Sequence, residues 1–187
     1  VAGTPFAVAR EAHIMLAKHA AELDKNLLDR LRRVGFKLDL GVEGTGWQFK
    51  YLIQGGGYYF NVGCSDMIAD GKIRLVHYDD IANFTQTGLR FKSGKTLESD
   101  LVVLATGYKG QEVLVSKLFG NDVAERVGPI WGFGANEELR NMFCRTRQPG
   151  LWFIAGGLAQ CRIYSRYLAL QIKASEEGLL PSIAPLT

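Results

Sequence analysis

Residues 100–111 read DLVVLATGYKGQ, and this stretch decides which fold class we expect. Four large apolar residues, Leu101 to Leu104, follow one another without a polar side chain between them. Such an uninterrupted run is typical of a strand buried on both faces, as in the centre of an α/β sheet. We therefore predict a buried strand over Leu101–Ala105. The run ends on small residues (Ala-Thr-Gly), which allow another molecule to come close to the backbone.

A second junction of the same kind lies near the C-terminus, where residues 149–160 read PGLWFIAGGLAQ. We predict a second buried strand over Leu151–Ala155, a break at two glycines, and a long helix from Leu158 to Glu177. Ligands of open α/β sheets bind outside the carboxyl ends of the strands, and a helix that begins there offers unpaired N–H groups to an anion. Both junctions together predict a site for a nucleotide-type cofactor, although each one alone is equally explained by a tight exit from a strand. The predicted cofactor-binding residues are Ala105, Thr106, Gly107, Tyr108, Gly156, Gly157, Leu158, Ala159 and Gln160.

The rest of the chain predicts helices and short strands. Apolar residues recur at helical spacing from Phe6 to Val34, which indicates an amphipathic helix that ends at Gly35. From Lys72 the apolar spacing changes to two, which predicts a β-meander with turns at Thr87-Gly88 and Ser93-Gly94. We also expect short helices over Val62–Ala69, with Asn61 as the N-cap, and over Glu112–Phe119, and irregular structure over 121–149.

The segment GTGWQF, residues 44–49, begins like a dinucleotide fingerprint. It has Phe49 where a third glycine would stand, so we expect a loop there and not a pyrophosphate site. The three glycines at 55–57 predict either a flexible turn or a close approach of the backbone to another surface.

Composition limits the classes of function. The chain has 187 residues, 47% of them hydrophobic, and a net charge of +3 without a basic stripe, which argues against a nucleic-acid partner. Its three cysteines and three histidines show no metal-ligand spacing, so we expect no metal site. No apolar run is long enough to cross a membrane and no signal peptide is evident, so we expect a soluble, cytoplasmic protein. The first residue is Val1, which suggests a piece of a longer protein.

Three segments in order carry a resemblance to a known family: residues 55–75 (GGGYYFNVGCSDMIADGKIRL), residues 98–110 (ESDLVVLATGYKG) and residues 149–160. Together they resemble the C-terminal part of flavin-containing monooxygenases, in particular the YUCCA-like oxidoreductases that use FAD and NADPH. The resemblance extends over roughly Leu23 to Leu180. It implies part of an α/β, two-dinucleotide-binding (Rossmann-like) flavoprotein fold with a β-meander and a long C-terminal helix.

This resemblance also implies two parts of the chain and a role for each junction. Residues 1–104 would be the end of the NADPH-binding domain, and residues 105–187 the C-terminal part of the FAD-binding domain. Ala105–Tyr108 would be the crossover between these domains, and Gly156–Gln160 the late FAD-binding turn. Because no intact GxGxxG loop occurs in the chain, we expect a C-terminal fragment that lacks an N-terminal segment of the same protein.

The implied reaction uses NADPH and O2 to oxygenate a small organic substrate. Because the cofactors carry that chemistry, we expect no catalytic side chain in this chain. Arg162 either faces the flavin or a substrate carboxylate, or forms a surface ion pair, and the aromatic residues Trp131, Trp152, Tyr164 and Tyr167 either line a substrate cavity or belong to the core. The alternative function is a non-catalytic, degenerate dinucleotide-fold binding module. A disulfide reductase is disfavoured because there is no redox-active cysteine pair.

Overall fold

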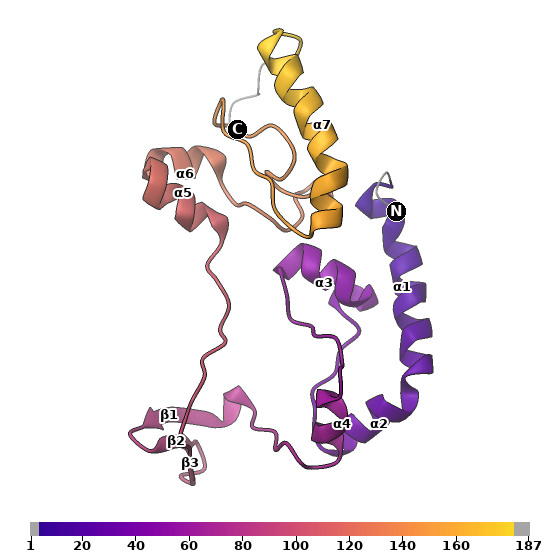
Figure 1. Ribbon diagram of the computed structural model, residues 1–187, viewed down its shortest axis with the longest axis vertical. Helices are drawn as coiled ribbons and strands as arrows, with labels where there is room; N and C mark the ends of the chain where they lie inside the picture. Colours follow the sequence, from indigo (N-terminus) through magenta and orange to yellow (C-terminus); the bar gives the residue numbers. More distant parts are fainter. Residues whose placement is uncertain (1–3, 182–187) are drawn as a thin grey trace. The chain divides into compact units, whose positions relative to one another are not determined.

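The computed structural model describes residues 4–181 (Figure 1). The chain forms two compact units. Of the described residues, unit 1 contains 4–18, 40–58 and 109–181, and unit 2 contains 19–39 and 59–108. The elements, in chain order, are α1 (Phe6–Leu23), α2 (Lys25–Arg33), η1 (Val42–Gly44), α3 (Gly46–Gln54), α4 (Cys64–Ala69), η2 (Tyr78–Asp80), β1 (Ile81–Thr85), β2 (Gly88–Phe91), β3 (Thr96–Glu98), α5 (Gln111–Phe119), α6 (Asn121–Val127) and α7 (Leu158–Glu176). The mixture of helices and sheet that we expected is therefore present.

Unit 1 is built around one hydrophobic core. Buried side chains from α3, α5, α6 and the loop after α6 form this core, and residues of the segment before α7 pack against it. Helices α5 and α6 pack against each other as a short antiparallel pair, which Figure 1 shows side by side. Phe49 of α3 is fully buried and meets the rings of Phe6 on α1 and Phe133 at centroid distances of 6.4 and 5.6 Å. These aromatic contacts hold α3 against the start of α1.

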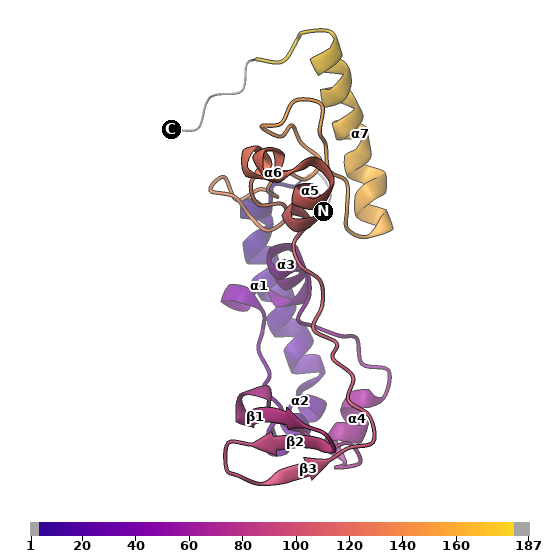
Figure 2. The ribbon, with the colours of Figure 1, turned by 90° about the vertical axis from the view of Figure 1, so that its left-hand side faces the viewer.

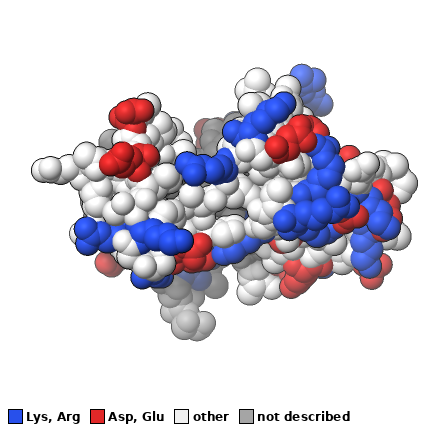
Figure 3. Space-filling view, turned by 90° about the horizontal axis from the view of Figure 1, so that it is seen from below, with Lys and Arg blue, Asp and Glu red and all other residues white. Residues whose placement is uncertain are grey.

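Unit 2 contains α2, α4 and the three strands. The strands pair antiparallel in the order β1-β2-β3, and Figure 2 shows them side by side. Helix α2 packs against α4, where Arg30 donates to Asp66 and Asp70 at 3.2 and 2.7 Å. Acidic and basic side chains are intermixed on the face in Figure 3, as expected from the small net charge.

Several predicted elements are confirmed. The second meander turn contains the expected Ser93-Gly94, whereas the first lies at Gln86-Thr87, one residue before the predicted dipeptide, because Gly88 already belongs to β2. Helices α5 and α7 lie within one residue of their predicted bounds. Gly35 has a φ of +83° and follows α2, so the predicted helix stop is correct. The Oδ1 atom of Asn61 accepts hydrogen bonds from the backbone N–H groups of Gly63 and Ser65, both at 3.0 Å, so it bonds to the start of α4. The N-cap itself is Gly63 and not Asn61, because α4 begins at Cys64, two residues later than predicted.

Other predictions are wrong. The long N-terminal helix is interrupted at Asp24, and residues 72–77 form no strand. GTGWQF is not a loop, because α3 begins at Gly46 and ends at Gln54. Its C-cap is Gly55, whose φ of +75° is typical of that position. Residues 121–149 are only partly irregular, since they contain α6.

The two predicted buried strands are also absent. Leu101 to Leu104 are between 42% and 79% exposed and form no strand. A central strand needs neighbours on both edges, and within residues 4–181 the only sheet consists of β1, β2 and β3. The segment 151–155 is likewise no strand, but Leu151, Phe153 and Ala155 pack against the core of unit 1 while Ile154 is exposed. Its side chains therefore alternate between core and solvent instead of being buried on both faces.

Candidate functional site

The candidate site lies in unit 1, at the N-terminus of α7. This helix follows Gly157, whose backbone is extended, and it has neither an acidic residue in its first turn nor a side chain that caps it. Among the described residues, no acceptor pairs with the backbone N–H groups of Leu158, Ala159 or Gln160. The helix therefore presents unpaired N–H groups and the positive end of its dipole to whatever lies in front of it.

Tyr51 of α3 stands directly before this helix. Burial raises the pKa of its hydroxyl, and a hydrogen bond from the backbone N–H of Gly157 to the hydroxyl oxygen acts in the opposite direction. The indole Nε1 of Trp131 donates to the backbone oxygen of Tyr51 at 3.0 Å, and the two rings meet edge to face at 5.2 Å. Trp131 thus fixes α3 at the residue that contacts α7.

Gly156 shows how closely the chain packs at this corner. Its φ is +99°, a conformation that favours glycine. A Cβ atom there would lie 2.3 Å from the Oε1 atom of Gln160 and 3.1 Å from the hydroxyl oxygen of Tyr51. Gln160 Oε1 is itself buried and has no hydrogen-bond partner among the described residues. A buried amide oxygen without a hydrogen-bond donor is costly, which points to a donor that a bound ligand supplies.

A cavity of about 530 Å³ opens beside this corner, between α1, α3 and α7. Its aromatic walls come from Trp47, Tyr51 and Tyr58, and the two tyrosine rings meet edge to face at 6.4 Å. The described residues that line it include no lysine, arginine, aspartate or glutamate. His13 also lines it, and burial lowers the pKa of this imidazole, so the neutral form is favoured. The cavity is therefore aromatic and uncharged, which suits a planar ring with hydrogen-bonding edges.

The predicted site residues fall in two different places. Gly157, Ala159 and Gln160 line the cavity and Gly156 lies at its corner, while the side chain of Leu158 is exposed. Ala105, Thr106, Gly107 and Tyr108 belong to unit 2, in an exposed, extended segment. Gly107 has a φ of +77°, and a Cβ there would meet no atom within 4 Å. For both groups, the cofactor-binding role stays a prediction.

The sequence analysis missed the contribution of α3. Trp47 and Tyr51 are four residues apart, which places them on one helix face, and Thr45 and Gly55 bound the helix on either side. This signal was in the sequence, but the GTG at 44–46 was interpreted as a loop. Of the other residues considered, Tyr164 lines the cavity, Arg162 is exposed and does not line it, and Trp131 packs against the core.

No protein-family model matches this chain, and no curated protein is significantly similar to it in sequence. In the part of the chain that the structure describes, no group of three or more His, Cys, Asp or Glu side chains is arranged to hold a metal ion. None of the helices described is both long enough and apolar enough to span a membrane.

Proposed function

We propose that this chain is the C-terminal part of a cytoplasmic flavin-dependent monooxygenase with a Rossmann-like fold, which uses NADPH and O2 to oxygenate a small organic substrate. The observation that carries the proposal is the uncapped N-terminus of α7 beside an aromatic, uncharged cavity. The proposal gives Gly156–Gln160 the task of binding the flavin end of FAD. It rests on the sequence resemblance for the reaction and on this cavity for the place of binding.

The residues of the cavity fit a flavin ring. Its electron-rich carbonyl edge suits the N–H groups at the start of α7, and the aromatic side chains of Trp47 and Tyr51 provide apolar surface for its faces. The unpartnered Oε1 of Gln160 suits a ring N–H as its donor. When bound, the flavin supplies the redox chemistry between NADPH and O2. The task of this chain is then to orient the ring and keep water from it.

The exposed run Leu101 to Leu104 supports the proposal that further strands come from an N-terminal segment of the same protein. Four consecutive apolar side chains exposed to water are unfavourable, and their backbone groups pair with no strand in the described residues. In a Rossmann-like sheet both costs would disappear, because neighbouring strands would pair with this segment and helices would cover it. Ala105–Tyr108 would then lie at the carboxyl end of a strand, where the resemblance places the crossover between the NADPH and FAD domains.

A second candidate is a non-catalytic binding module that keeps the cavity beside the N-terminus of α7 and has lost the phosphate-binding loops. It is favoured by the lack of an intact GxGxxG in the sequence. The two candidates differ in what lies upstream: a reading frame that encodes GxGxxG after a strand supports the monooxygenase, and a natural start near Val1 supports the module.

The experiment is a titration of the purified 187-residue chain with lumiflavin, the flavin ring without its phosphates. We expect ring binding to quench the fluorescence of Trp47, which lines the cavity. Gly157→Leu should weaken the affinity for lumiflavin, measured by this quenching, about tenfold or more. A Cβ at Gly157 meets no atom of the chain within 4 Å, so the added side chain would occupy the space that the ligand needs. Gly56→Leu is the matched control, since Gly56 also has open space around its Cβ and does not line the cavity.

Far-ultraviolet circular dichroism of each variant verifies that the helices remain. Absence of quenching in the natural sequence, or equal quenching in the folded Gly157→Leu variant, would refute the assignment of this cavity to the flavin. FAD itself should be lost on desalting, because its phosphates have no loop to bind them.

A further inference from the structure

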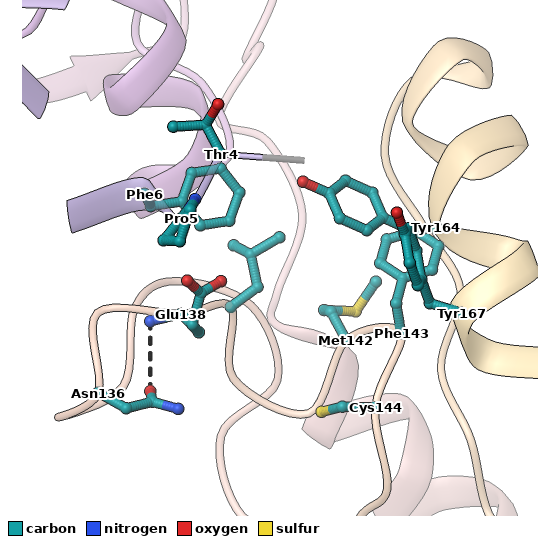
Figure 4. Close-up of a pocket in the computed structure, with 11 residues that line it drawn as sticks. Thr4, Pro5, Phe6, Asn136, Glu138, Met142, Phe143, Cys144, Tyr164 and Tyr167 are labelled. Atoms are coloured by element: carbon teal, nitrogen blue, oxygen red, sulfur yellow. Dashed lines mark hydrogen bonds between the residues drawn. The ribbon is translucent and has the colours of Figure 1, made fainter. Parts of the chain in front are cut away.

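Unit 1 has a second cavity, of about 510 Å³, which the proposed function does not use (Figure 4). It lies between the start of α1, the loop that contains Asn136 and Glu138, and the α7 side chains Tyr164 and Tyr167. Figure 4 shows the loop residues on one side of the cavity and the two tyrosine rings on the other. Its volume is within the range of small-molecule sites.

Aromatic faces dominate this cavity. Phe143 and Tyr164 lie with their ring centroids 5.3 Å apart, and the rings of Tyr164 and Tyr167 lie 6.3 Å apart. Phe6 contributes a further ring, and Met142 lies at the bottom of the cavity as Figure 4 shows it. The negative faces of several aromatic rings around one space attract a cation.

Among the described residues that line the cavity, Glu138 carries the only charged side chain. Hydrogen bonds hold its backbone: the N–H of Glu138 donates to Asn136 Oδ1 at 3.2 Å, and its carbonyl accepts from the N–H of Gly134 at 2.9 Å. Among the described residues its carboxylate forms no ion pair and accepts no hydrogen bond. The lining that the structure describes contains no lysine or arginine, so none of these side chains offsets the carboxylate.

The same charge disfavours anions in this space. Burial raises the pKa of the Tyr164 hydroxyl, and the charge of Glu138 and the neighbouring Tyr167 raise it further. Tyr164 therefore stays neutral and adds its ring face without adding negative charge. A neutral apolar ligand would remove water from the Glu138 carboxylate and give it no partner, which is unfavourable.

We propose that this cavity binds an organic cation, namely an ammonium group attached to an apolar body. The ammonium group lies over the rings of Tyr164 and Tyr167 beside the Glu138 carboxylate, and the apolar body packs on Phe6, Phe143 and Met142. The proposal does not depend on the flavin assignment, because the two sites differ in charge and in the probes that test them.

The test uses the 187-residue chain labelled with 13C at the methionine methyl groups. Met142 lines the cavity and is only 3% exposed, whereas Met15 and Met67 lie elsewhere and are exposed, so they serve as internal references. The probe is phenyltrimethylammonium, and its neutral counterpart of the same shape is tert-butylbenzene. We expect the cation to shift the methyl signal of Met142 and to leave the two references unchanged.

Substitution of the carboxylate separates charge recognition from simple apolar binding. Glu138 is exposed, so Glu138→Gln should weaken the affinity for the cation about two- to fivefold, as expected for an exposed ion pair. Glu125→Gln is the matched control, because it makes the same change in net charge at an exposed position of α6 that does not line the cavity. It should leave the affinity unchanged.

Three results would overturn the proposal. The first is a Met142 signal that does not move at tens of millimolar cation. The second is equal affinity for phenyltrimethylammonium and tert-butylbenzene. The third is a Glu138→Gln variant that binds the cation as well as the natural sequence, which would show that the carboxylate has no part in recognition.

Discussion

Replacement of Gly156 by alanine tests the geometry in front of α7 most directly. Gly156 has a φ of +99°, and its missing side chain leaves room for the Tyr51 hydroxyl and the Gln160 amide. A methyl group at this position would occupy space that these two side chains now fill. We therefore expect Gly156→Ala to destabilise unit 1.

The magnitude follows from two contributions. A left-handed backbone costs a non-glycine residue about 1–2 kcal/mol. The new Cβ would lie 3.1 Å from the Tyr51 hydroxyl oxygen, so this hydroxyl must move and its interaction with the Gly157 N–H is weakened, at a cost of about 1 kcal/mol. The Gln160 amide is the end of a flexible side chain and can turn away at little cost. The sum is a loss of about 2–3 kcal/mol.

The assay is urea unfolding followed by tryptophan fluorescence. Trp47, Trp131 and Trp152 all belong to unit 1, so the signal reports on this unit. With a slope of about 2 kcal/mol per molar urea, the midpoint should fall by about 1–1.5 M. Gly157→Ala is the matched control: Gly157 has a φ of −68° and open space around its Cβ, so its stability should stay within about 1 kcal/mol of the natural sequence.

Two results would refute this reasoning. If Gly156→Ala unfolds at the same urea concentration as the natural sequence, Gly156 does not have a left-handed backbone beside Tyr51. If Gly157→Ala is destabilised as much as Gly156→Ala, the loss comes from the start of the helix in general and not from the close approach at Gly156.

Three further predictions concern other parts of the chain. Tyr51→Phe should lower the free energy of unfolding of unit 1 by about 1 kcal/mol in the same urea assay, because it removes the hydroxyl that accepts from Gly157, and a loss below about 0.3 kcal/mol would contradict the interaction. Cys144 should react with iodoacetamide more slowly than the exposed Cys64 at pH 8, since burial raises the pKa of the Cys144 thiol and less of it is thiolate; peptide mass spectrometry over time gives both rates, and equal rates would contradict its burial. Val103→Lys should reduce light scattering of the concentrated chain, because it places a charge in the exposed apolar run, and unchanged scattering would show that this run does not drive self-association.

Local signals in the sequence were sufficient for elements whose ends are fixed by neighbouring residues. Asn61 accepts hydrogen bonds from the first turn of α4, and Gly35 ends α2 through its left-handed backbone. The second meander turn needed only its Gly-containing dipeptide, because Gly94 supplies the positive φ of +86° within the turn, whereas the first turn lies one residue before the predicted dipeptide. The break at Asp24 has no comparable signal in the apolar spacing, so the first helix was predicted too long.

The candidate site was predictable in part. Gly156 and Gly157 lie at the start of a helix that the sequence indicates clearly, and the structure places a cavity there. That Tyr51, more than a hundred residues earlier, supplies the side chain in front of this helix is a tertiary contact, and no local pattern specifies it. The same holds for Glu138 and Tyr164, which come from different segments and become neighbours only in the folded unit.

The apolar run at Leu101 to Leu104 shows most clearly what the sequence determines and what the tertiary structure determines. The sequence by itself determined that this segment is apolar and that its residue types favour an extended backbone, because valine is β-branched and no polar residue interrupts the run. Only the tertiary structure decided that it is exposed and forms no strand. A strand exists through hydrogen bonds to a neighbour, so whether a segment becomes one depends on which partner segments the folded chain brings beside it.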